Sequence, residues 1–106
     1  MVKRYTNCPV EYTASIISNK WKILILRDLL TGVKRYNELT KLVVGISAKV
    51  LTQNLRDLEA DGIVQRRVYP VVPPKVEYSL TSKGLALKSV LQSMEQYGNT
   101  YKDGSK

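Results

Sequence analysis

A row of polar side chains with hydrogen-bonding ends lies on one side of a helical pattern near the middle of the chain. Lys49, Gln53 and Arg56 are spaced at i, i+4 and i+7, which places them on one stripe of a helix. Glutamine can pair bidentately with adenine, and arginine or lysine with guanine. Ser47 and Thr52 fall on the same surface. We therefore expect these five residues to contact base edges in DNA, although an ordinary solvated helix face would share this pattern.

Further basic residues stand on both sides of this helical pattern. Arg35 precedes it, and Arg66, Arg67 and Lys75 follow it in a segment rich in β-forming residues. We expect these four side chains to contact the phosphate backbone of a nucleic acid. The alternative is that at least one of the two adjacent arginines forms a salt bridge with an acid of the preceding helix: Asp57, Glu59 or Asp61.

The composition favours a polyanion partner and argues against an enzyme. The 106 residues include 17 Lys+Arg and 9 Asp+Glu, a net charge of +8, and eleven of the bases lie between Lys20 and Lys75. A folded basic module favours nucleic acid over a membrane surface as partner. The chain has no His and one Cys, which removes imidazole-based catalysis, an internal disulfide and a zinc site. We predict no catalytic residue, no metal and no cofactor.

No segment of the sequence has the pattern of a signal peptide or of a membrane span. The first four residues, Met1 to Arg4, are not followed by an apolar run, and the aliphatic run from Ile23 to Leu26 is too short to cross a bilayer. We therefore expect a cytoplasmic protein without membrane contact.

Four helices are expected before the basic β-rich segment. Pro9 suits the first turn of a short helix, and a second helix over about residues 20–30 is apolar on most sides. A third covers about residues 36–42. Ser47 caps a fourth, which runs to Ala60 and ends at Asp61-Gly62. In that fourth helix Leu51, Leu55 and Leu58 form one buried stripe.

The rest of the chain predicts a hairpin and one last helix. Residues 63–69 and 75–80 have the composition and alternation of strands, and prolines interrupt the tip between them. Thr81 caps a last helix that reaches about Tyr101. We expect one domain over residues 8–101, with a flexible N-terminus at 1–7 and a flexible tail at 102–106. The fold class is mainly α with a small β-hairpin wing, a winged helix-turn-helix.

Nearly the whole chain, about Cys8 to Tyr101, resembles the HxlR-type transcriptional regulators, winged helix-turn-helix proteins that are MarR-like. Two departures are visible. Ser18-Asn19 stands where the family usually has glycines before Lys-Trp, and Tyr97-Gly98 stands where it often has Trp-Gly. The segments that carry the resemblance are Cys8-Pro9-Val10, Lys20-Trp21, Arg35-Tyr36-Asn37-Glu38-Leu39, Gly45-Ile46-Ser47, Leu51-Thr52, Leu58-Glu59-Ala60-Asp61-Gly62, Pro73-Pro74-Lys75-Val76-Glu77-Tyr78, Leu80-Thr81 and Gly84.

The resemblance implies a homodimer that binds double-stranded DNA and dimerises through its terminal helices, as a repressor or an activator. Apolar positions in the last helix also extend beyond what a small core can cover, although some of them must pack on the first two helices. Two subunits related by a twofold axis would read a palindrome with half-sites about 10–10.5 bp apart. The predicted dimer contacts are Leu87, Val90, Leu91, Met94, Tyr97 and Tyr101.

Cys8 is a second candidate for chemistry. It directly precedes Pro9, at or near a helix N-terminus, which stabilises a thiolate. In several members of the family that this chain resembles, a Cys at this place senses quinones, aldehydes or oxidants. The resemblance thus implies an electrophile or another small molecule as effector. A small residue packed at the dimer interface is the alternative. With no second Cys, a disulfide would have to join two subunits.

The sequence therefore predicts a sequence-specific DNA-binding transcriptional regulator that binds a palindromic operator as a homodimer. A winged-helix protein-interaction module is the alternative, and it would need an exposed apolar patch in place of the face from Lys49 to Arg56. A role in RNA binding has less support, because the seven Tyr are scattered and form no stacking platform.

Overall fold

The structure, a computed structural model, describes residues 7–104 of the chain. The predicted flexible N-terminus at 1–7 lies outside the described residues apart from Asn7, as do the last two residues of the predicted tail at 102–106. The secondary-structure elements are α1 (Pro9–Ile16), α2 (Lys20–Leu29), β1 (Lys34–Arg35), α3 (Tyr36–Leu42), α4 (Ala48–Ala60), β2 (Val64–Tyr69), β3 (Lys75–Leu80), α5 (Ser82–Leu85) and α6 (Lys88–Tyr101).

Side-chain caps fix where three of the helices begin. The side chain of Asn19 accepts a hydrogen bond from the backbone N–H of Lys22 at 3.0 Å and starts α2. Ser47 accepts one from Val50 at 3.2 Å and starts α4, and Thr81 caps α5 in the same way. Each cap satisfies a backbone donor that has no partner within its helix. The predicted cap at Ser47 and the predicted helix limits near Ala60 are confirmed.

The sheet has three antiparallel strands in the order β1-β3-β2. The predicted hairpin is β2 and β3, with Val64 opposite Leu80 and Tyr69 opposite Lys75. The prediction of only two strands was incomplete, because β1 pairs with the other edge of β3. Two residues are too few to show an alternating pattern in the sequence, so this strand is defined only by its partner.

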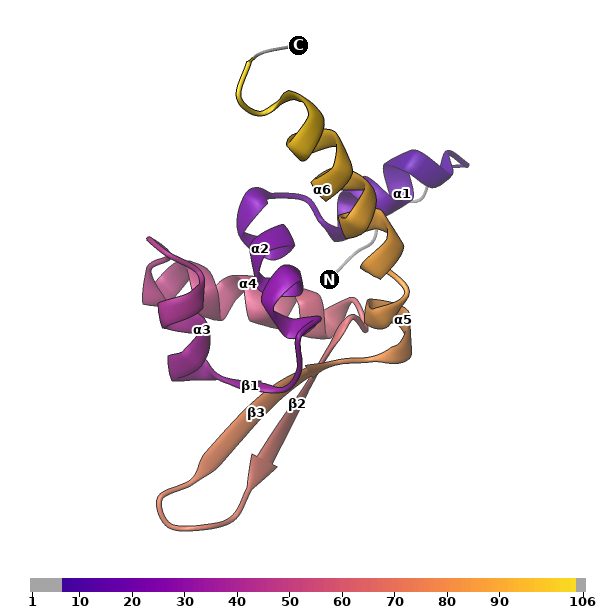
Figure 1. The fold of residues 1–106 in the computed structure, drawn as a ribbon. Helices are drawn as coiled ribbons and strands as arrows, with labels where there is room; N and C mark the ends of the chain where they lie inside the picture. Colours follow the sequence, from indigo (N-terminus) through magenta and orange to yellow (C-terminus); the bar gives the residue numbers. More distant parts are fainter. Residues whose placement is uncertain (1–6, 105–106) are drawn as a thin grey trace.

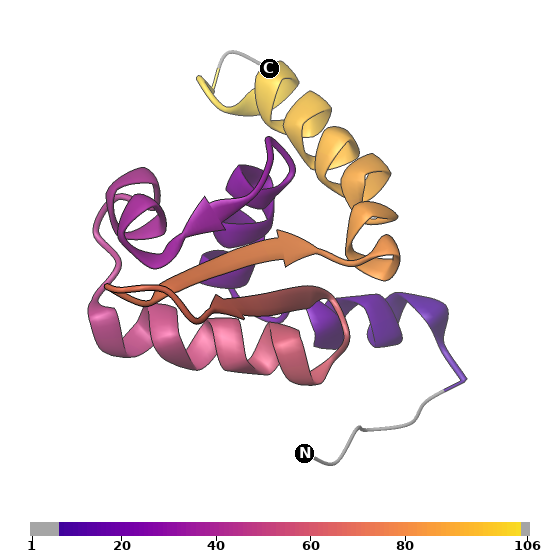
Figure 2. The ribbon, with the colours of Figure 1, turned by 90° about the horizontal axis from the view of Figure 1, so that it is seen from below.

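The core lies between α2, α3, α4 and the sheet. The leucine stripe of α4 is buried as predicted, and it packs against the apolar side of α2. The wing formed by β2 and β3 extends from one end of this helical body, and α1 and α6 lie at the other end (Figure 1). A view from below shows α4 running alongside the strands (Figure 2). Buried apolar side chains are Ile16, Ile25, Leu26, Leu29, Leu39, Val43, Leu51, Leu55, Leu58, Ile63, Val64 and Tyr78.

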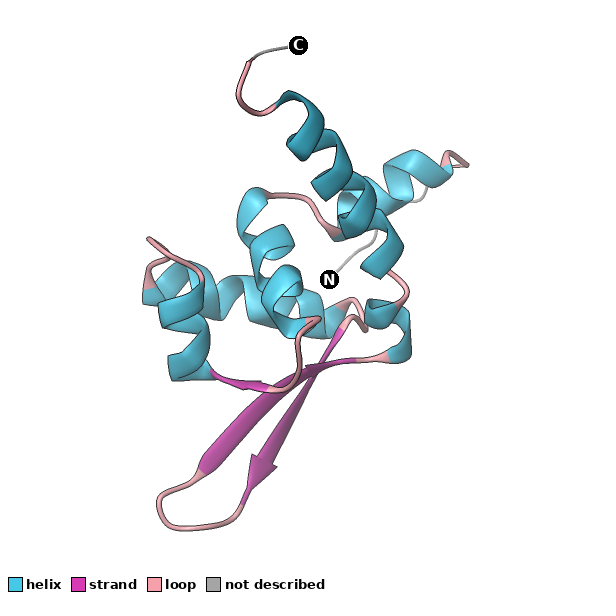
Figure 3. Ribbon diagram, in the orientation of Figure 1, coloured by secondary structure: helices cyan, strands magenta, loops and turns pink. Residues whose placement is uncertain are grey.

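The prediction of one unbroken last helix is wrong. The chain forms the short α5, turns at Ala86 and Leu87, and continues as α6, which leads away from the sheet (Figure 3). The reason is a tertiary contact at Gly84. This residue is buried against the backbone of Ile63, and a Cβ atom there would collide with the Ile63 carbonyl oxygen. The same carbonyl accepts a hydrogen bond from the Thr81 backbone N–H at 3.0 Å, so α5 is fixed against the start of β2.

Within residues 7–104 no helix has the length and apolar character needed to cross a membrane.

We expect Gly84→Ala to lower the free energy of unfolding by about 1–3 kcal/mol, because the added methyl group must displace backbone rather than a flexible side chain. Urea denaturation measures this change. Gly98→Ala, measured on dilute monomeric protein, is the matched control: a Cβ at Gly98 meets nothing within 4 Å in its own chain, and the position lies inside α6. Alanine should therefore stabilise that helix by up to about 1 kcal/mol. A loss of stability at Gly98 equal to that at Gly84 would contradict the explanation.

Candidate nucleic-acid interface

The predicted base-reading stripe is exposed on α4. Lys49, Gln53 and Arg56 are all solvent-exposed, while the leucines on the other side of the helix are buried. Ser47 is also exposed, and its hydroxyl oxygen already accepts a hydrogen bond as the cap of α4. Lys49 and Arg56 form no salt bridge with any residue from 7 to 104. Their charges therefore face solvent.

Thr52 differs from the other predicted base contacts. It is half-buried, and its hydroxyl lies 3.0 Å from the Tyr36 hydroxyl. The Tyr36 hydroxyl also donates to the backbone carbonyl of Ala48 at 3.1 Å. These contacts join the start of α3 to the first turns of α4 and so fix the angle of the helix-turn-helix. A contact between the Thr52 hydroxyl and a base stays a prediction, and it would compete with this bond.

The wing brings one arginine beside the reading helix. Arg66 and Arg56 line a hollow of 370 Å³ between α4 and β2, and Glu59 and Tyr78 also line it. Successive residues of a strand point to opposite faces, so Arg67 lies on the other face of the wing. The sequence analysis grouped these two arginines together, but Arg66 faces α4 and Arg67 faces away from it. The alternation within residues 64–69 could have predicted this separation.

The salt-bridge alternative for these two arginines does not hold within the described part of the chain. Neither Arg66 nor Arg67 is paired with an acid there. Asp57 is instead bound to Lys22, with 3.4 Å between the Lys22 Nζ and Asp57 Oδ2 atoms. Both arginine side chains are exposed.

The remaining predicted phosphate contacts are partly engaged within the protein. The Nζ atom of Lys75 lies 3.6 Å from Glu77 Oε2 and 4.7 Å from the centre of the Tyr69 ring. Arg35 is exposed just before α3, and its strand partner is also Glu77. Glu77 therefore lies beside Lys75 and opposite Arg35, and it offsets part of their positive charge.

Sequence reasoning missed the polar side chains that support the reading helix from behind. Lys22 is only 5 % exposed although α2 was expected to be an apolar core helix. Asn54 is 6 % exposed, and its side-chain oxygen accepts a hydrogen bond from Asn19 at 3.0 Å. The i, i+4 spacing of Gln53 and Asp57 was a readable signal for a contact, but nothing in the sequence pattern pointed to Lys22.

The predicted dimer contacts divide into two groups. Leu87, Val90 and Leu91 are half-buried, and Leu87 and Leu91 pack on the core of their own chain. Met94, Tyr97 and Tyr101 are 42 %, 70 % and 49 % exposed. The sequence analysis expected some of these residues to pack on their own chain, and this holds for Leu87 and Leu91. Met94, Tyr97 and Tyr101 are not covered by their own chain.

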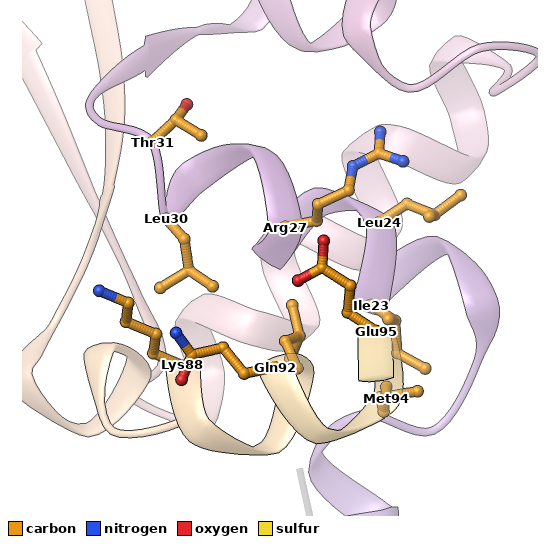
Figure 4. A pocket seen from close by; sticks show the side chains of 10 residues that line it. Ile23, Leu24, Arg27, Leu30, Thr31, Lys88, Gln92, Met94 and Glu95 are labelled. Atoms are coloured by element: carbon orange, nitrogen blue, oxygen red, sulfur yellow. The ribbon is translucent and has the colours of Figure 1, made fainter. Parts of the chain in front are cut away.

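A groove of 520 Å³ separates α6 from α2. Its walls are mainly apolar, with Ile23, Leu24 and Leu30 on the α2 side and Leu91 and Met94 on the α6 side (Figure 4). At its rim, the hydrogen bond that Arg27 donates to the Asp28 carboxylate raises the pKa of the guanidinium. The groove is contiguous with the exposed part of α6.

Cys8 occupies the N-cap position of α1 and is exposed. Among residues 7–104 there is no group of three or more His, Cys, Asp or Glu side chains arranged to hold a metal ion.

The family of HxlR-like helix-turn-helix proteins matches residues 16–106. The chain belongs to this family. The match covers all of the helix-turn-helix, the wing and the last helix, and it agrees with the resemblance found in the sequence. The predictions of family and of fold class are therefore confirmed.

Named relatives of this HxlR-like chain are transcriptional regulators rather than enzymes, as expected. The HTH-type transcriptional regulator YdeP of Bacillus subtilis is 50 % identical over 99 residues, which cover 93 % of this chain and 77 % of YdeP. The redox regulator HypR in its reduced form is 45 % identical with a TM-score of 0.86, covering 91 % of this chain and 95 % of HypR. Reduced YodB of B. subtilis is 37 % identical with a TM-score of 0.81, covering 95 % of this chain and all 100 % of YodB.

Proposed function

We propose that this HxlR-like regulator binds a specific palindromic duplex sequence as a homodimer, with α4 in the major groove and the wing on the adjacent backbone. The observation that carries the proposal is the exposed stripe of Lys49, Gln53 and Arg56, which continues into Arg66 across the hollow between α4 and β2. Side chains able to pair with bases and side chains able to pair with phosphates thus share one surface.

The exposed face of α4 argues against the alternative of a protein-interaction module. Such a module needs an apolar patch where α4 faces solvent, and apart from Ala48 and Ala60 at its two ends the exposed residues of α4 are polar or charged. The large exposed apolar residues Met94, Tyr97 and Tyr101 belong to α6, and this helix lies at the opposite end of the molecule from the wing (Figure 1).

To test DNA reading, bound sequences are selected from a random duplex pool and the affinity of each variant is measured on the selected sequence. We expect Gln53→Ala or Arg56→Ala to cost about 1–3 kcal/mol at one base position. Lys75→Ala should weaken binding to all sequences alike and lower the salt slope by about one unit.

Lys102→Ala is the control, because this lysine has the same charge but lies at the end of α6. Unlike Lys75→Ala, it should leave both the affinity and the salt slope nearly unchanged. If a scrambled duplex binds as tightly as the selected one at physiological salt, the sequence-specific reading is refuted. Salt-insensitive binding of a protein partner without any DNA binding would support the interaction module instead.

The proposal of a homodimer rests on the apolar surface at α6. The rings of Tyr97 and Tyr101 are in tilted contact, with 4.9 Å between their centres, and both residues are exposed, as is Met94. Exposed aromatic side chains beside an apolar groove are characteristic of an interface core. A second copy of the chain would cover both.

We expect Tyr97→Asp to shift the protein toward a monomer in sedimentation equilibrium and to weaken operator binding, because it places a charge in the proposed contact. Asn99→Asp is the control, because it adds the same charge about 200° around α6 from Tyr97. Its measured molecular mass should remain that of a dimer. Equal dissociation by both variants would contradict the assignment of this face, and a wild-type monomer would refute the dimer.

We also propose that Cys8 senses oxidants or electrophiles. Its exposure at the N-cap of α1 supports this role, and HypR, whose structures are described as oxidized and reduced forms, is similar over most of the chain. An electrophilic quinone would form a carbon–sulfur bond with the thiolate. An oxidant such as diamide would take two electrons and two protons from two Cys8 thiols and join two subunits by a disulfide.

We expect diamide or a quinone to change the operator affinity of the wild-type protein and to leave that of Cys8→Ser unchanged, with equal affinities for both proteins before treatment. Mass spectrometry and non-reducing electrophoresis distinguish an adduct from a disulfide. If Cys8→Ser responds to the same extent as the wild type, sensing through Cys8 is ruled out, while DNA reading is unaffected by that result.

A further inference from the structure

A chain of polar contacts runs from the junction of α1 and α2 to the reading face of α4. The ammonium group of Lys22 donates to the Ser18 hydroxyl at 3.1 Å and lies 3.4 Å from Asp57 Oδ2. The other oxygen of Asp57 accepts a hydrogen bond from Gln53 Nε2 at 3.0 Å. Gln53 is thus the exposed end of a network whose other end is buried.

The contact with Asp57 sets which way the Gln53 amide points. Rotation of the amide by half a turn would bring its oxygen against the carboxylate, and two acceptors repel each other. The nitrogen therefore stays toward Asp57. One of its two hydrogens is used there, and the second hydrogen and the carbonyl oxygen are left for another partner.

The remaining donor and acceptor match one base. Adenine presents an acceptor at N7 and a donor at N6 in the major groove, and the glutamine amide can satisfy both. Guanine presents two acceptors, O6 and N7, so the fixed carbonyl oxygen of Gln53 would face an acceptor. An amide that is already oriented also loses less side-chain entropy on binding.

Lys22 makes Asp57 a rigid support rather than a mobile surface acid. The Lys22 side chain is 7 % exposed and that of Asp57 is 30 % exposed. A buried ammonium strongly requires its counter-charge, so Oδ2 of Asp57 is fixed and Oδ1 is directed to Gln53. The backbone N–H of Lys22 donates to Asn19, whose side chain also donates to Asn54 on α4, and this contact holds α2 and α4 in register.

We propose that Asp57, held by the buried Lys22, is a positioning residue for base specificity that orients Gln53 to read adenine. This inference rests on the proposed reading of DNA by α4. A glutamine and an aspartate four residues apart also stabilise an isolated helix, and that role alone would affect folding without affecting base choice.

The test is a double-mutant cycle on base discrimination. Affinities of the wild type, Gln53→Ala, Asp57→Ala and the double variant are measured on the selected duplex and on duplexes changed at each base pair. We expect Asp57→Ala to lower the preference for adenine by about tenfold at the position that Gln53→Ala affects, within the range of coupling between contacting residues. In the Gln53→Ala background, Asp57→Ala should cause no further loss of preference.

Two variants separate this effect from charge and from folding. Glu59→Ala removes the same charge from α4, and Glu59 has no hydrogen bond to Gln53, so it should strengthen binding to all duplexes while preserving the preference at the Gln53 position. Lys22→Met with Asp57→Ala removes both charges together, which avoids leaving a buried ammonium without its counter-charge. This double variant should lose as much of the preference for adenine at the Gln53 position as Asp57→Ala alone.

Additive effects of Gln53→Ala and Asp57→Ala, or an unchanged preference in both Asp57 variants, would overturn the positioning role while leaving DNA reading intact. If the wild type selects no sequence at all, the proposed function and this inference fall together. If it selects a base pair without adenine at the Gln53 position, the assignment of adenine is overturned.

Discussion

The contact between α2 and α4 is the constraint on which the other parts of the structure depend. Leu51, Leu55 and Leu58 of α4 are buried with Ile25 and Leu26 of α2. Burial of each such side chain contributes about 1.5–3 kcal/mol, so this stripe decides which face of α4 is left outside. The wing follows α4 directly in the chain, and α3 is bonded to its first turns. The exposed stripe, the hollow and the helix-turn-helix angle are therefore consequences of how α4 lies on α2.

Apolar and polar contacts make different contributions to this arrangement. Leucine side chains tolerate small rotations and shifts because dispersion and burial are not directional. The bonds from Asn19 to Asn54 and from Lys22 to Asp57 are directional, and they hold α4 at one rotation and register. A buried ion pair adds little net stability, but an alternative register would leave a charge unpaired, which is far more costly. The polar pair thus contributes more to a unique arrangement than to the free energy of unfolding.

Much of the fold could be predicted because its signals are local. The leucine stripe, the Ser47 cap and the end at Asp61-Gly62 all lie within one helix and its neighbours. The features that were missed depend on residues far apart in the chain: β1 exists only through pairing with Tyr78 and Glu77, and the break after α5 reflects Gly84 against Ile63. For the site, residue types and spacing indicated which side chains face outward. They could not show that Thr52 is engaged with Tyr36 or that Lys22 is buried.

The positive charges around the hollow between α4 and β2 favour the binding of a polyanion at this surface. Arg56 and Arg66 line the same cavity with one acid, Glu59, and neither is in a salt bridge within residues 7–104. Like charges held together by the fold repel, and a polyanion bound at this surface would reduce that repulsion while adding charge-assisted hydrogen bonds. Arg67 points to the other face of the wing, so its charge is not part of this cluster.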